Sequence, residues 1–204
     1  VEEIEEKDAL LGASGYALAS RPATDAIPFK PLKTLSEAVF RGIQLSSGQR
    51  ESAASREGEE VFLLNSGDIR DEREPGDYLP EKIRFWHRKW ALYALKEGDL
   101  VISARGTVIK TMVIRPEHLP AIASSNVLCA RLKEGAVDPH YLKAFLDSPH
   151  GQLMLNSVQT GRTIKAINPR SLESVQIPCP EFERQKRIGE AYRKAQEDFR
   201  RERE

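Results

Sequence analysis

Arginine and lysine side chains that could contact nucleic-acid phosphates or bases are concentrated in two stretches of an otherwise neutral chain. The 204 residues include 31 basic and 31 acidic side chains, so the net charge is zero. Residues 82–115 nevertheless carry eight bases against two acids, and residues 156–170 carry three bases and no acid. Positive charge in such stretches can bind phosphate, and an arginine can also donate two hydrogen bonds to a guanine. Chance clustering of solvated surface charges is the alternative interpretation.

Sequence patterns that would support catalysis are missing. No glycine-rich phosphate loop follows a predicted strand, and there is no Gly-x-Ser-x-Gly elbow. Two cysteines and four scattered histidines form no pair at metal-ligand spacing, so we expect no metal site and no cofactor. Asp99 and Lys110 fit a nuclease-like arrangement of Asp followed by Glu-x-Lys only when the pattern is forced.

The basic side chains must be positioned by short strands and by helices with clear start signals. Apolar runs predict strands at residues 59–65, 100–103, 108–114, 121–132 and 175–177, the second and third forming a hairpin around a tight turn. An N-cap residue followed by proline predicts helices that begin at Asp138-Pro139, Ser148-Pro149 and Asn168-Pro169.

Three further segments complete the expected fold. A capping box from Thr34 to Glu37 predicts a short helix that stops at Gly42, and the polar segment 44–58 is expected to be an exposed loop. Residues 180–204 carry an apolar stripe at helical spacing. We therefore expect an α+β fold, with a twisted mixed, mostly antiparallel sheet, short helices and a long C-terminal helix.

The order of these motifs resembles the recognition-domain repeat of type I restriction–modification specificity subunits. The resemblance covers residues 32–204 and rests on four pieces in sequence: Gly98-Asp99-Leu-Val-Ile-Ser-Ala-Arg-Gly106, then Val137-Asp138-Pro139-His140-Tyr141-Leu142, then Thr160-Gly161-Arg162-Thr-Ile-Lys165-Ala-Ile167, then Pro178-Cys-Pro180-Glu-Phe-Glu-Arg-Gln185-Lys-Arg-Ile188. Cys179 interrupts the usual proline pair, and Arg184 stands where the family has a glutamate.

The resemblance implies a non-catalytic module that reads double-stranded DNA by sequence and directs an adenine methyltransferase, and in some systems a restriction subunit, to its target. Side chains of the hairpin and loops are then expected to enter the major groove, and further lysine and arginine side chains are expected to contact phosphates. The candidates for base or phosphate contact are Arg105, Thr107, Lys110, Arg162, Thr163 and Lys165. The candidates for phosphate contact alone are Lys82, Arg84, Arg88 and Lys89.

The resemblance also implies partners for the two ends of the chain. We expect residues 1–31 to be a linker or tail of an upstream region, residues 32–179 to be the recognition domain, and residues 180–204 to be a spacer helix. This helix would dock onto the methyltransferase or pair with a second recognition domain through Ile188, Tyr192, Ala195 and Phe199. Ile4 to Asp8 and Tyr16 to Leu18 are similar to the tail of the methyltransferase partner, and the chain starts at Val1, which together indicate a fused parent chain.

Two other classes of function compete with this hypothesis. A protein-interaction or scaffold module would have the same C-terminal helix without DNA contact, and its basic stretches would scatter over different faces. A small DNA-modifying enzyme would need a metal site or a cofactor loop. The sequence contains no apolar run of membrane-spanning length and no signal-like start, so we expect a cytoplasmic protein with no membrane contact.

Overall fold

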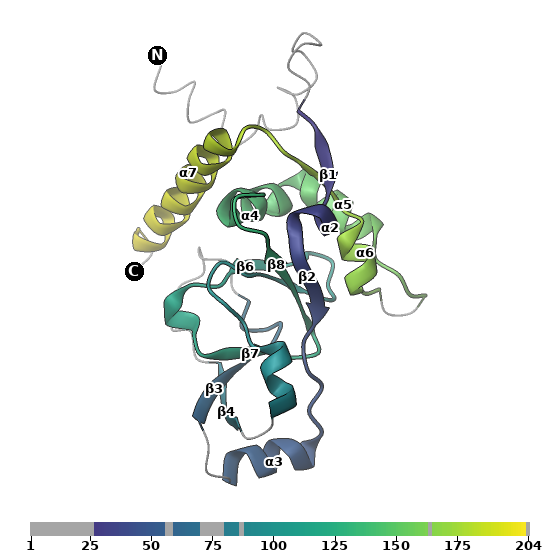
Figure 1. The fold of residues 1–204 in the computed structure, drawn as a ribbon, viewed down its shortest axis with the longest axis vertical. Coiled ribbons are helices and arrows are strands. Elements are labelled where there is room, and N and C mark those ends of the chain that lie inside the picture. Colours follow the sequence, from purple (N-terminus) through teal and green to yellow (C-terminus); the bar gives the residue numbers. More distant parts are fainter. Residues whose placement is uncertain (1–26, 56–58, 70–79, 86–87, 163–164, 203–204) are drawn as a thin grey trace.

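The computed structural model describes residues 27–55, 59–69, 80–85, 88–162 and 165–202 (Figure 1). Its strands are β1 (Phe29–Pro31), β2 (Ser36–Arg41), β3 (Glu59–Leu64), β4 (Glu81–Phe85), β5 (Leu100–Ser103), β6 (Thr111–Val113), β7 (Ala121–Ala123), β8 (Val127–Leu132) and β9 (Gln176–Pro178). Its helices are α2 (Leu32–Leu35), α3 (Ser47–Ser55), η2 (Arg88–Tyr93), η3 (Pro116–His118), α4 (Pro139–Asp147), α5 (Pro149–Ser157), α6 (Pro169–Glu173) and α7 (Phe182–Arg201), where η marks 3₁₀ helices.

The described strands form three small sheets. Four strands pair in the order β2-β8-β5-β6, three pair in the order β4-β3-β7, and β1 pairs with β9. All of these pairs are antiparallel except β3 with β7. Figure 1 shows the three-stranded sheet and α3 in the lower part of the molecule, with the four-stranded sheet and α4 to α7 above them. The expected α+β class, mostly antiparallel pairing and long C-terminal helix are confirmed.

Both faces of the four-stranded sheet are covered. Leu100 and Ile102 of β5 face the core that includes residues of α4, α5 and α6, whereas Val101 between them belongs to a second core that includes residues of β7. Side chains alternate across a strand, so only a strand that is covered on both sides can be apolar throughout. This explains why β5 is a continuous apolar run. A third core under the three-stranded sheet contains Trp90.

The predicted helix after Thr34 is wrong. Residues 36–41 instead form β2, which pairs with β8 from Ser36 opposite Leu132 to Arg41 opposite Leu128, and the helix α2 lies just before it. The Thr34 hydroxyl donates to the carbonyl oxygen of Pro31 (2.8 Å), which lies within the preceding turn. Pairing with a strand some ninety residues away therefore overrode the local capping signal.

The expected loop at residues 44–58 is also wrong, because it contains α3. The Ser46 hydroxyl accepts a hydrogen bond from the backbone N–H of Gln49 (3.3 Å), and the Gln49 side chain accepts one from the backbone N–H of Ser46 (2.9 Å). These two bonds are a capping box of the Ser-x-x-Gln type, which the sequence analysis overlooked.

The remaining helix starts are confirmed. The Asp138, Ser148 and Asn168 side chains each accept a hydrogen bond from a backbone N–H at the start of α4, α5 and α6. The expected lead-in at residues 1–31 lies largely outside the described residues, although β1 at its end pairs with β9. Among the described helices none has the length and apolar character that would cross a bilayer.

Candidate nucleic-acid interface

One end of the four-stranded sheet brings together segments that are far apart in the sequence. Strands β2 and β5 both run antiparallel to β8, and β6 runs antiparallel to β5. The last residues of β2 and β5 and the first residues of β6 and β8 therefore lie at the same end. We call residues 104–110, 124–126 and 159–167, which gather at this end, the sheet-end loops.

The first of these loops, residues 104–110, contains three of the predicted DNA contacts. Arg105, Thr107 and Lys110 are all exposed, and Gly106 has a φ of +138°, a backbone conformation that side-chain-bearing residues rarely adopt. The base of the loop is closed by hydrogen bonds from the Ser103 N–H to the Lys110 carbonyl and from the Lys110 N–H to the Ser103 hydroxyl (both 2.9 Å). The predicted hairpin turn is thus a wide, exposed loop on a short hairpin.

The third loop, residues 159–167, docks against the first. Thr160 and Ala166 exchange backbone hydrogen bonds (both 2.9 Å) and so close a turn that carries Arg162 and Lys165, both exposed. The Ile167 N–H donates to the Ala104 carbonyl (2.9 Å), and Arg105 forms a β-bridge with Ala166. Arg105, Arg162 and Lys165 therefore lie in adjoining segments, and Lys110 lies at the same sheet end.

Arg41, at the end of β2, links two of the sheet-end loops, and the sequence did not indicate it. Its guanidinium donates to the carbonyl oxygen of Ser125 (2.8 Å) and to that of Ile167 (2.6 Å). Partial burial, and then the charge of Arg105, lower its pKa. Arg41 lies outside both basic stretches, so charge counting gave no signal for it.

The four predicted phosphate contacts lie elsewhere, on and after β4 of the three-stranded sheet. Lys82 lies over the ring of Phe62 (5.7 Å to the centroid), and Arg84 pairs with Glu60 at 3.7 Å. Lys89 is exposed in η2; the side chain of Arg88, and Thr163 of the third loop, lie outside the described residues. The role of this group as phosphate contacts stays a prediction.

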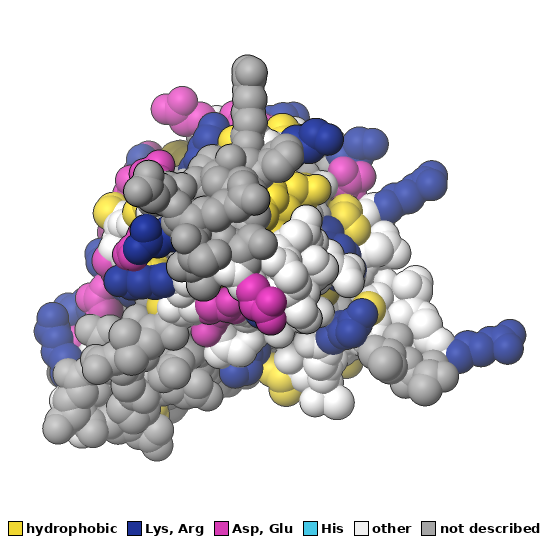
Figure 2. Space-filling view, turned by 90° about the horizontal axis from the view of Figure 1, so that it is seen from below, with side chains coloured by type: hydrophobic (Ala, Val, Ile, Leu, Met, Phe, Trp, Pro, Cys, Tyr) yellow, Lys and Arg dark blue, Asp and Glu magenta, His cyan; other side chains and the backbone are white. Residues whose placement is uncertain are grey.

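The surface view agrees with a local bias of charge rather than one continuous basic face. Figure 2 looks at the molecule from below the view of Figure 1. Lys and Arg side chains project from its right-hand side with little acid between them, whereas basic and acidic side chains alternate along the left. On the face that this view shows, the basic side chains therefore form no single continuous patch.

The expected partner face of the C-terminal helix is divided between two environments. Ile188 packs against the core, and the Tyr192 hydroxyl donates to the carboxylate of Asp147 on α4 (2.8 Å). Gly189 lies so close to α4 that an added Cβ would be 2.8 Å from the Tyr141 nitrogen. Ala195 and Phe199 are exposed further along α7. The helix is thus packed on this domain as far as Tyr192, and of the four predicted residues only Ala195 and Phe199 are exposed.

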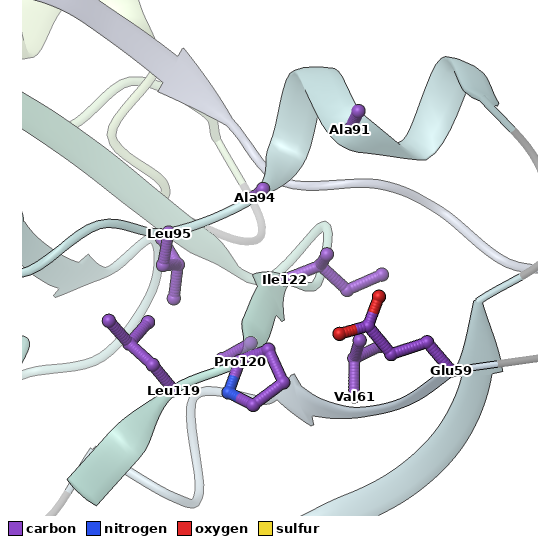
Figure 3. A pocket seen from close by; sticks show the side chains of 9 residues that line it. Glu59, Val61, Ala91, Ala94, Leu95, Leu119, Pro120 and Ile122 are labelled. Carbon is purple, nitrogen blue, oxygen red and sulfur yellow. The ribbon is translucent and has the colours of Figure 1, made fainter. Parts of the chain in front are cut away.

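The side chains considered for a metal or nuclease site are not brought together in the described part of the chain. No three His, Cys, Asp or Glu side chains among them are grouped so that they could hold a metal ion. Asp99, the acid of the forced nuclease alignment, is buried and receives two hydrogen bonds from Arg131. A hollow of about 260 Å³ lies beside β3 and β7. Figure 3 shows the side chains that line it, of which Glu59 is the charged one. An apolar hollow with a single carboxylate lacks the paired groups that acid–base or nucleophilic catalysis requires.

Comparison with solved structures shows the same fold in specificity subunits. The HsdS subunit from Thermoanaerobacter tengcongensis matches with a TM-score of 0.63 and 21% identity, over 97% of this chain and 45% of that one. A chain from a study of complex assembly and conformational transition of the type I restriction–modification system matches with a TM-score of 0.64 and 19% identity, over 97% and 46%. The S subunit from M. genitalium gives 0.50 and 13%, over 84% and 40%. The chain thus spans less than half of each of these proteins.

Comparison with sequences supplies the family. No curated protein matches the chain closely enough to be counted as a relative. The family model of the type I restriction modification DNA specificity domain matches residues 88–197, more than half of the chain, and this span includes all three sheet-end loops. The chain therefore belongs to the family of type I restriction–modification DNA specificity domains.

Proposed function

We propose that this chain reads one part of a double-stranded DNA target through its sheet-end loops and directs an adenine methyltransferase to that site. Its family consists of non-catalytic DNA-recognition subunits, which agrees with the expectation that it catalyses nothing itself. The observation that carries the proposal is the meeting of Arg105 with the turn that bears Arg162 and Lys165, sixty residues further along the chain.

The sheet-end loops have the chemistry that groove recognition needs. Arginine can bond guanine O6 and N7 together, lysine can bind a phosphate, and threonine can bond either. Gly106 and Gly161, with φ of +138° and +117°, leave no side chain between the backbone and an approaching duplex. Arg41 fixes two of these loops to the sheet. The exposed arginine and lysine side chains therefore project from a braced surface rather than from free loops.

Removing Arg162 and Lys165 together should weaken DNA binding and flatten its salt dependence. Each lost phosphate contact reduces the slope of log affinity against log salt by roughly 0.9, so Arg162→Ala with Lys165→Ala should lower it by roughly two. The measurement is fluorescence anisotropy of a labelled duplex bound by the full chain at several salt concentrations.

A matched control removes two lysines from the opposite end of the same sheet. Lys33 of α2 precedes β2, and Lys133 follows β8 where Leu132 pairs with Ser36; both are exposed. Lys33→Ala with Lys133→Ala removes the same charge and should leave the slope nearly unchanged. Equal effects of the two double variants, or a flat salt response of the unmodified chain, would instead favour the interaction-module hypothesis.

The second half of α7 is proposed to meet a partner helix, either of the methyltransferase or of a second recognition domain. Phe199 is 40% exposed there, and an exposed aromatic side chain on a helix is stabilised by burial against another helix. Phe199→Glu should therefore lower self-association of the full chain in sedimentation at tens of micromolar. A chain that sediments as a monomer with or without this substitution would argue against the second recognition domain as partner.

A further inference from the structure

A valine projects into solvent at the tip of the first sheet-end loop. Val108 is 69% exposed, although its neighbour Ile109 is 1% exposed and belongs to the core. The backbone at this point thus turns one apolar side chain inward, where it anchors the loop, and the preceding one outward. A single exposed apolar residue is common on protein surfaces, but Val108 stands on a braced backbone and among basic side chains.

Two glutamine side chains brace the backbone on both sides of Val108. The Gln152 amide accepts a hydrogen bond from the Ile109 N–H (2.9 Å) and donates to the Ile109 carbonyl (2.8 Å), as a neighbouring strand would. The Gln159 amide donates to the Gly106 carbonyl (3.2 Å). Gln152 also donates to the Leu146 carbonyl (2.9 Å), so its side chain links the loop to α4. The loop tip is therefore fixed in place, and ordering Val108 on a ligand costs little conformational entropy.

The surroundings of Val108 are basic and polar. Arg105, Thr107 and Lys110 are the other exposed side chains of this loop. The turn that carries Arg162 and Lys165 is hydrogen-bonded to the start of the loop at Ala104. An apolar side chain between phosphate-binding groups is suited to one feature of the major groove, the 5-methyl group of thymine, which is the one apolar group on a base edge there.

We infer that Val108 is a specificity-determining residue that contacts the 5-methyl group of a thymine in the target. This inference rests on the proposed function, since it requires the sheet-end loops to enter the major groove. It adds to that proposal a named base and a residue that the charge pattern could not indicate.

The test compares thymine with deoxyuridine, which lacks only the 5-methyl group. A duplex selected by the unmodified full chain from a random pool is remade with each thymine replaced in turn by deoxyuridine. At one position the unmodified chain should lose about fourfold in affinity, the value of one buried methyl group. Val108→Ala should lose a similar factor on the thymine duplex and should be insensitive to deoxyuridine at that position.

Leu92→Ala is the matched control, because Leu92 is 75% exposed but lies in η2, outside the sheet-end loops. It should keep the full sensitivity to deoxyuridine. If Val108→Ala weakens every duplex equally, or keeps the same sensitivity as the unmodified chain at every thymine, the inference is overturned while the proposed function stands. If the unmodified chain selects no preferred duplex, the proposed function fails and the inference fails with it.

Discussion

Replacing Asp99 by alanine should lower the free energy of unfolding by about 3–5 kcal/mol, because it would leave the largely buried Arg131 without its acidic partner. Asp99 is 2% exposed and accepts hydrogen bonds from the Arg131 Nε (3.0 Å), the Arg131 Nη2 (2.8 Å) and the Lys96 N–H (2.8 Å). The bond to Asp99 raises the pKa of Arg131. Without Asp99 the guanidinium would lose this support but would remain charged, because the pKa of an arginine lies far above neutral pH. Urea denaturation of the full chain, followed by circular dichroism, measures the loss.

An exposed ion pair provides the control for this prediction. Glu183 and Lys186 of α7 lie 3.1 Å apart, but the glutamate side chain is 80% exposed, so Glu183→Ala should change stability by less than about 1 kcal/mol. A loss of that small size for Asp99→Ala as well would show that Arg131 finds other partners, and that the pair does not stabilise the sheet. The result also bears on function, because a purely structural Asp99 leaves the nuclease alignment without its acid.

Features of the fold that depend on neighbouring residues could be predicted from the sequence. An N-cap followed by proline needs only four residues to satisfy the first free N–H groups of a helix, and the three helices announced in this way by Asp138, Ser148 and Asn168 all form. The long amphipathic helix and the hairpin of β5 with β6 are likewise local patterns.

Features that depend on distant pairing could not be predicted. The residues of β2 carry a helix start signal, and only the ladder with β8 makes them a strand. The same holds for the candidate site. The loops at residues 104–110 and 159–167 were each named from charge and resemblance, yet their contact exists because the Ile167 N–H donates to the Ala104 carbonyl. No spacing in the sequence encodes that bond.

Interior roles of charged residues were also beyond sequence reasoning. Arg41 and Lys143 carry the same charge as solvated residues nearby, but one braces two loops and the other is almost fully buried. The C-terminal helix shows the same limit, since periodicity identified its apolar stripe but not that α4 covers the first half. Periodicity identifies an apolar stripe, but it carries no information about which element of the fold covers that stripe.

Substituting Asp147 should both destabilise the domain and loosen its C-terminal helix. The carboxylate accepts hydrogen bonds from the Lys143 ammonium (2.6 Å), the Thr111 hydroxyl (2.5 Å) and the Tyr192 hydroxyl (2.8 Å), and so joins α4, β6 and α7. Lys143 is 1% exposed and lies 5.6 Å from the centroid of the Tyr192 ring. Asp147→Ala leaves this ammonium buried without its acid, which costs about 3–5 kcal/mol. Urea denaturation measures the cost, and hydrogen exchange in residues 182–196 reports the loosening of α7.

Restoring an apolar interior separates the two causes of this loss. Lys143→Met with Asp147→Leu removes the stranded charge while keeping similar volumes, so it should recover much of the stability lost by Asp147→Ala. Exchange in α7 should remain faster than in the unmodified chain, because Tyr192 still lacks its acceptor. If the double variant is as unstable as the single one, the bonds from Thr111 and Tyr192 and not the buried ammonium account for the loss. If α7 exchanges at its original rate in both variants, Asp147 does not fix the helix, and the contacts of Gln185, Ile188 and Gly189 hold α7 on the domain without it.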